Sequence, residues 1–129
     1  MNRLLLIFSA LFFLGAVPLF ANYMSHNPTL LESATEGDMK AQYEIAKIYE
    51  QEALADGDLW EPAPEPWGKA IFWYEAAAAQ GSKQAQYALL ARGYSTEDEA
   101  QKNKWLKLAT TLAEGGDKYA QYRLAEHFY

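Results

Sequence analysis

The stretch that decides the fold is GDMKAQYEIAKIYE, which runs from Gly37 to Glu50. It returns as GSKQAQYALLARGY from Gly81 and as GDKYAQYRLAEHFY from Gly116. The copies are spaced within the range of about 20–50 residues that is typical of repeat arrays. This spacing indicates a repeat protein, in which each helix pair buries its apolar face against its neighbours.

Each copy opens with a glycine that is followed by Asp38, Ser82 or Asp117. Glycine adopts the left-handed conformation that ends a helix, and a short polar side chain caps the next N-terminus. Behind the first cap, Ala41 and Ile45 share one helix face with further apolar residues at helical spacing. These patterns predict that each copy is the first helix of a repeat.

Second helices are predicted between the copies. Trp73 is followed four residues later by Ala77, and Trp105 is followed in the same way by Ala109. A large aromatic residue beside a small one lets neighbouring helices approach closely. Glutamates on the exposed sides of the helices, Glu75 among them, are expected to form a solvated face.

The starts of two helices are predicted from local signals in the sequence. One helix is expected from Pro28 to Glu36, because proline is favourable at a helix start. The second helix of the second repeat is expected to begin at Ser95 or Thr96, with acidic residues in its first turn. The count is about six helices with no strand, an all-α fold.

The pattern Gly-x-x-x-Ala-Gln-Tyr-x-Leu-Ala-x-x-Tyr, followed by Lys-Ala-x-x-Trp-Tyr-x-x-Ala-Ala-x-Gln-Gly, resembles the Sel-one-like repeat, a branch of the tetratricopeptide-like α/α solenoids. The resemblance implies a right-handed α/α solenoid of about two and a half helix-pair repeats, with a concave face that holds other proteins. Leu90 and Gly93 depart from the pattern and predict looser packing in the second repeat. The repeat-structural positions are Gly37, Ala41, Tyr43, Ala46, Tyr49, Trp73, Ala77, Gly81, Ala85, Tyr87, Trp105, Ala109, Gly116, Ala120, Tyr122 and Ala125.

The N-terminal residues 1–21 have the layout of a secretory signal peptide. Arg3 precedes an almost unbroken apolar run over residues 4–20, and the small residue Ala21 follows. The alternative is an uncleaved anchor in the inner membrane. We expect residues 22–129 to form the repeat domain of an exported protein, and the absence of cysteine favours a bacterial periplasm.

The charge and the motifs of the sequence exclude several classes of function. The chain has 17 acidic and 11 basic residues, so its surface should repel nucleic acid and anionic lipid. The sequence contains no nucleophile, metalloprotease or phosphate-loop motif. Its two histidines, His26 and His127, cannot build a metal site alone, and the acidic turn at Asp56 lacks a calcium-loop pattern. We expect a non-catalytic protein without a metal or cofactor.

The segment from Asp56 to Trp67 is a candidate partner-binding loop. Alternate prolines favour an extended polyproline form, and tryptophans offer large contact areas. The alternative is that Trp67 opens the next helix and that the tryptophans cover the end of the first repeat. The candidate contact residues are Trp60, Pro62, Pro64 and Trp67.

The C-terminal edge is a second candidate surface, with Leu124, Phe128 and Tyr129. Uncapped solenoid ends are adhesive, so this edge is expected to bind a partner protein or a second copy of the chain. The solenoid groove is the third candidate. The expected function is a periplasmic or envelope adaptor. The alternatives are an inhibitor of a secreted toxin or lipase and a membrane-tethered, self-assembling scaffold.

Overall fold

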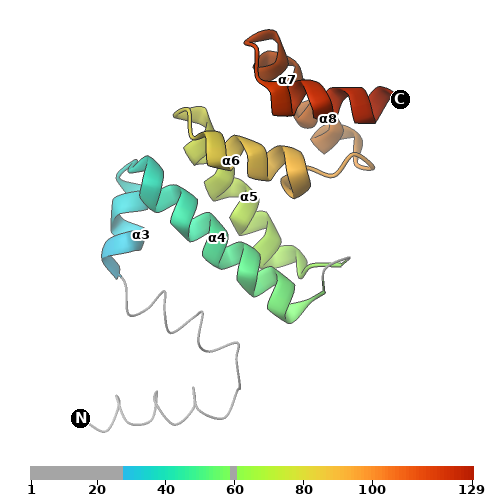
Figure 1. Ribbon diagram of the computed structural model, residues 1–129. Helices are drawn as coiled ribbons and strands as arrows, with labels where there is room; N and C mark the ends of the chain where they lie inside the picture. The colour runs from blue at the N-terminus through green and yellow to red at the C-terminus, as the bar shows by residue number, and fades with distance from the viewer. Residues whose placement is uncertain (1–27, 59–60) are drawn as a thin grey trace, which may run out of the picture. The chain divides into compact units, whose positions relative to one another are not determined.

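The fold is all-α, as predicted. The computed structural model describes residues 28–58 and 61–129, and these contain no strand. Within these residues, six α-helices and one π-helical turn follow one another and pack in adjacent pairs (Figure 1). They are α3 (Pro28–Thr35), α4 (Met39–Asp56), α5 (Pro64–Ala79), α6 (Lys83–Ala88), η1 (Leu89–Gly93), α7 (Glu99–Glu114) and α8 (Lys118–Phe128).

The predicted signal segment, residues 1–21, lies outside the described residues. Within the described part of the chain, no helix is both long enough and apolar enough to span a bilayer.

The chain divides into two compact units, and the boundary falls within α5, after Trp73. In the first unit, Ala34, Ala41 and Ile45 are buried, and Trp73 of α5 packs against them. The second unit has its own core, in which the indole N–H of Trp105 donates to the Leu90 carbonyl at 2.9 Å. The buried members of that core are Leu90, Trp105, Ala109 and Ala120.

The predicted glycine junctions are confirmed. Gly37 has φ 101°, a left-handed conformation in which a residue with a Cβ would be strained. The Gly37 N–H donates to the Ala34 carbonyl at 3.1 Å and the Asp38 N–H to the Ser33 carbonyl at 2.9 Å, a Schellman motif. The Asp38 carboxylate then accepts the Ala41 N–H at 2.7 Å. The same arrangement recurs at Gly81 (φ 97°) with Ser82 and at Gly116 (φ 92°) with Asp117.

The glutamine of each Ala-Gln-Tyr tripeptide secures the same junction. The Gln42 side-chain amide donates to the Ala34 carbonyl at 3.0 Å, so that carbonyl accepts two hydrogen bonds. Each of these glutamines thus reaches back eight residues to the last turn of the preceding helix, which explains why glutamine stands in every copy. The corresponding bonds are Gln86 to Ala78 at 3.2 Å and Gln121 to Ala113 at 3.1 Å.

The second repeat contains an extra residue that the π-helical turn η1 accommodates. The Tyr94 N–H donates to the Leu89 carbonyl, five residues earlier, at 3.0 Å. Tyr94 thereby reaches a half-buried site beside the core, as Tyr49 does in the first repeat. The looser packing predicted at Leu90 and Gly93 is wrong, because both residues are buried and Leu90 contacts Trp105.

Helix α7 begins later than predicted. Asp98 is its N-cap and accepts the Gln101 N–H at 2.9 Å. Ser95 instead belongs to a preceding turn, where its hydroxyl accepts the Glu97 N–H at 3.2 Å and its own N–H donates to the Gln101 side chain at 2.9 Å. Because these side-chain bonds satisfy the backbone locally, the chain does not enter the helix at Ser95 or Thr96.

Candidate functional site

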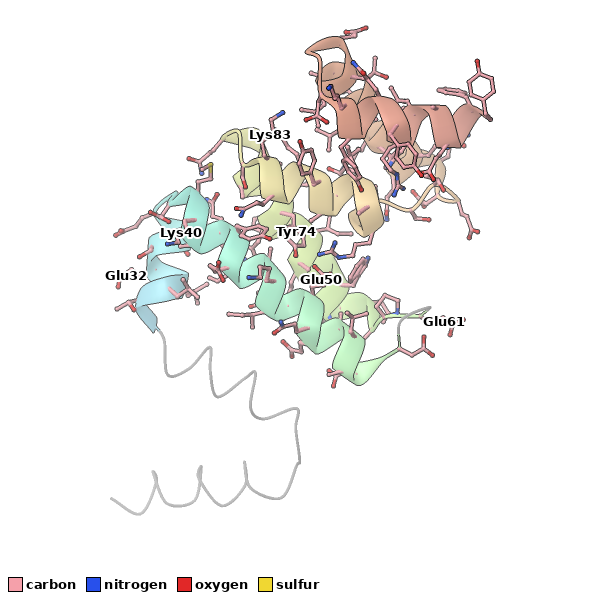
Figure 2. All side chains as sticks on the ribbon, viewed as in Figure 1. Glu32, Lys40, Glu50, Glu61, Tyr74 and Lys83 are labelled. Carbon is pink, nitrogen blue, oxygen red and sulfur yellow. The ribbon has the colours of Figure 1, made fainter. Side chains whose placement is uncertain are left out.

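The loop between α4 and α5 is closed by short-range hydrogen bonds. The Glu61 N–H donates to the Asp58 carboxylate at 2.7 Å, and the Asp58 N–H donates to the Glu61 carbonyl at 3.1 Å. Figure 2 labels Glu61 in this loop. Gly57 leaves room for the turn, since a Cβ there would collide with the Glu61 carbonyl. The candidate contact residue Trp60 lies outside the described residues.

The proline-rich segment is helical rather than extended from Pro64 onward. Pro64 is the first residue of α5, where its missing N–H costs nothing. Trp67 is half-buried in the first turn of α5, and its N–H donates to the Ala63 carbonyl at 3.1 Å. The predicted polyproline form is therefore wrong for this part, and Trp67 does open the next helix. Pro62 is half-buried just before it.

The tyrosine of the third copy differs from the other two. Tyr43 and Tyr87 are half-buried, and the Tyr87 hydroxyl donates to the Asp117 carboxylate at 2.6 Å. Tyr122 is 59% exposed, and its hydroxyl donates at 2.7 Å to Glu126 of its own helix. Tyr122 was predicted as a repeat-structural residue together with Tyr43 and Tyr87, but unlike them it is exposed.

The geometry of α8 explains this exposure. Ala120 and Leu124 belong to the core shared with α7. Tyr122 lies two positions from each of them and so points about 200° away around the helix. Ala125, which was also predicted as a repeat-structural residue, is likewise exposed.

Two aromatic residues at the end of α8 are open to solvent. Phe128 is 67% exposed and Tyr129 is fully exposed, whereas Leu124 is half-buried. His127 anchors this end, because its ring centroid lies 5.0 Å from that of Trp105. We use the name α8 outer face for the exposed apolar and aromatic residues from the middle of α8 to its C-cap, namely Tyr122, Ala125, Phe128 and Tyr129.

A pocket of about 450 Å³ lies between the last turns of α5 and helix α7, within the second unit. We call it the α5–α7 pocket. Its apolar lining comes from Ala78 and Ala79 of α5, Leu89 of η1 and Leu108 of α7. The two alanines follow Glu75 at helical spacing, and Leu108 follows Lys104 in the same way, so one face of each helix forms a wall.

The polar lining of the α5–α7 pocket is a hydrogen-bonded cluster. Glu75 accepts the Tyr94 hydroxyl at 2.9 Å and lies 3.1 Å from the Lys104 ammonium. Burial, together with the hydrogen bond to Glu75, raises the pKa of Tyr94, so its hydroxyl remains a proton donor. Glu75 was predicted to be solvated, but it is half-buried and fully engaged.

Lys107 is the remaining charged residue of the pocket and is exposed. Its ammonium pairs with no carboxylate of residues 28–58 and 61–129. Nor do these residues contain three histidine, aspartate or glutamate side chains grouped to hold a metal ion. Sequence reasoning missed the pocket, because its lining residues come from separate helices between Glu75 and Thr111 and no local pattern connects them.

Comparison of the chain with protein-family models, with characterised proteins and with solved structures found no match. The resemblance to Sel-one-like repeats therefore rests on the sequence pattern alone.

Proposed function

We propose that the chain is a non-catalytic protein-binding module, a right-handed α/α solenoid of about two and a half Sel-one-like repeats. The three junctions support this assignment. Each has the left-handed glycine, the capping side chain and the back-bonding glutamine at the same position. Because all three junctions share these features, each of them turns the chain from one helix into the next in the same way.

The α8 outer face carries the functional proposal. Three aromatic side chains are exposed here, Tyr122 and Phe128 of α8 and Tyr129 at its C-cap. Large aromatic residues are enriched in protein interfaces, where they bury much area at a low cost in conformational entropy. We infer that this face binds another protein, in preference to a second copy of the chain.

The proposed location is the bacterial periplasm or envelope. The apolar run over residues 4–20 supports export. In an exported chain, the absence of cysteine favours a bacterial periplasm over a eukaryotic exterior. If the segment is retained, the module is tethered to the inner membrane. A secreted toxin or lipase as partner would make the protein an inhibitor, and a signalling protein would make it an adaptor.

Partner capture tests the proposal. The tagged full-length chain is used to retain proteins from the envelope fraction of its host, with the double variant Tyr122→Ser plus Phe128→Ser beside it. We expect a stoichiometric partner whose capture falls by at least about tenfold in the variant, as for interface hot spots. Circular dichroism checks that the variant is folded.

Phe72→Ser is the matched control, since Phe72 is 63% exposed on α5 in the first unit. Capture that survives the α8 change but fails in the Phe72 variant would contradict the α8 assignment. Light scattering on the purified chain tests the homodimer. A stable dimer that the α8 variant dissociates would replace the partner proposal with self-assembly.

A further inference from the structure

We propose that the α5–α7 pocket binds a peptide segment of the partner in which one large apolar side chain is flanked by acidic residues. The inference rests on the proposed function and gives the chemistry of a second contact, separate from the α8 outer face.

The size and lining of the pocket suit one large apolar side chain together with the peptide segment that flanks it. Its volume of about 450 Å³ lies at the lower end of the range for ligand pockets, about 300–1,000 Å³. Leu89 and Leu108 supply branched apolar surface, and the short side chains of Ala78 and Ala79 leave the space between the helices open. A leucine or phenylalanine side chain placed there would remove apolar surface from water on both partners.

The charge of the pocket is opposite in sign to the net charge of the chain. The whole chain has a formal net charge of −6, yet the pocket is lined by two lysines and one glutamate. Glu75 is already matched by Lys104 and the Tyr94 hydroxyl, at 3.1 Å and 2.9 Å. Lys107 therefore stands as an uncompensated cation beside an apolar surface. An acidic residue next to the bound apolar side chain would complement it.

Fluorescence anisotropy with defined peptides tests the proposal on the full-length chain. The probe is an end-capped, fluorescein-labelled peptide with one leucine between two glutamates in a glycine–serine background. One matched peptide replaces the leucine by serine, and another replaces both glutamates by lysine. We expect binding of the first peptide alone, with an affinity that weakens as salt is added.

Two variants locate the site. Lys107→Glu should weaken binding of the leucine–glutamate peptide by about fivefold or more, from the energies of exposed ion pairs. Lys118→Glu is its matched control, because Lys118 is an exposed residue of α8 and the change in net charge is identical. Ala79→Phe should fill the pocket and abolish the leucine-dependent binding, since Ala79 is exposed and carries no core contact.

Several results would overturn the inference. These are no binding at about 1 mM peptide, equal binding of the leucine and serine peptides, or equal effects of Lys107→Glu and Lys118→Glu. Direct binding of dodecanoate without any peptide binding would assign the pocket to a small amphiphile instead. If the peptides fail while capture through the α8 outer face persists, the pocket inference falls and the proposed function stands.

Discussion

At the scale of single residues, Asp117 links two helices. It caps α8 by accepting the Ala120 N–H, and its other oxygen accepts the Tyr87 hydroxyl of α6 and lies 3.4 Å from the Lys83 ammonium. The Tyr87 hydrogen bond foremost, and then the Ala120 N–H and Lys83, hold the pKa of Asp117 below its ordinary value of 3.8. The ionised carboxylate therefore stabilises the fold above the pKa of the unfolded chain. That contribution is lost as the pH falls through the lower, folded-state pKa.

We expect this linkage to appear in acid titrations of stability. The free energy of unfolding, measured with urea from about pH 6 to about pH 3, should fall less steeply in Asp117→Asn than in the wild type. Tyr87→Phe should give an intermediate slope, since it removes only the hydroxyl. Asp38→Asn, at the corresponding cap of α4, is the matched control. Equal slopes for the wild type and Asp117→Asn would contradict the prediction.

The residue types predicted the helix caps, but they did not predict the hydrogen bonds that the glutamine side chains make. A glycine followed by Asp or Ser identifies a helix junction from local chemistry alone, and all three such junctions are present. Gln42 belongs to the repeated Ala-Gln-Tyr tripeptide, but the sequence did not indicate its hydrogen-bond partner. Its partner, the Ala34 carbonyl, comes within 3.0 Å only because the left-handed glycine turns α4 back along α3. The repetition was visible in the sequence, but its cause needed the backbone path.

At the scale of elements, η1 explains why one repeat departs from the pattern. Counting from the repeat tyrosine, Tyr49 follows Tyr43 by six positions, whereas Gly93 holds that place after Tyr87 and Tyr94 comes one later. The five-residue hydrogen bond of the π-helical turn absorbs this extra residue. Removing Gly93 should therefore restore an α-helical turn and leave Tyr94 at its half-buried site.

We predict that the Gly93 deletion costs little stability. Its urea midpoint and helical circular dichroism should stay close to those of the wild type, because the register of the core residues before it is unchanged. Deleting Leu106, in the middle of α7, is the control. That deletion rotates the residues after it, Ala109 included, by about 100° and should cause a large loss of stability. Similar losses in both deletions would show that the π-helical turn is required by the packing itself.

Helix positions were easier to predict than the surfaces between helices. Periodicity and caps located α3, α4 and α8 closely, because those signals are local. The start of α7 was missed where side chains of the preceding turn compete for the backbone. The α5–α7 pocket joins residues that are far apart in the sequence, such as Glu75 and Lys104, and no local pattern indicates which helix faces line it.

At the scale of the whole molecule, stability should be distributed rather than held in one core. The first unit buries Ile45 against Ala34 and Ala41, and the second buries Trp105 among separate residues. Because the two units bury separate cores, parts of the chain are expected to open with different free energies. A cavity made in one unit should therefore lower the free energy of local opening in that unit more than in the other.

Hydrogen exchange of the Ile45→Ala variant tests this expectation. Ile45 is fully buried, and truncating such a side chain costs about 2–5 kcal/mol. We expect faster exchange throughout α3 and α4, while the amides of α7 and α8 keep most of their protection. Leu90→Ala should give the reverse pattern, because Leu90 belongs to the core of the second unit. If both variants accelerate exchange evenly from Pro28 to Tyr129, the chain unfolds as a single cooperative body and the two units are not energetically separate.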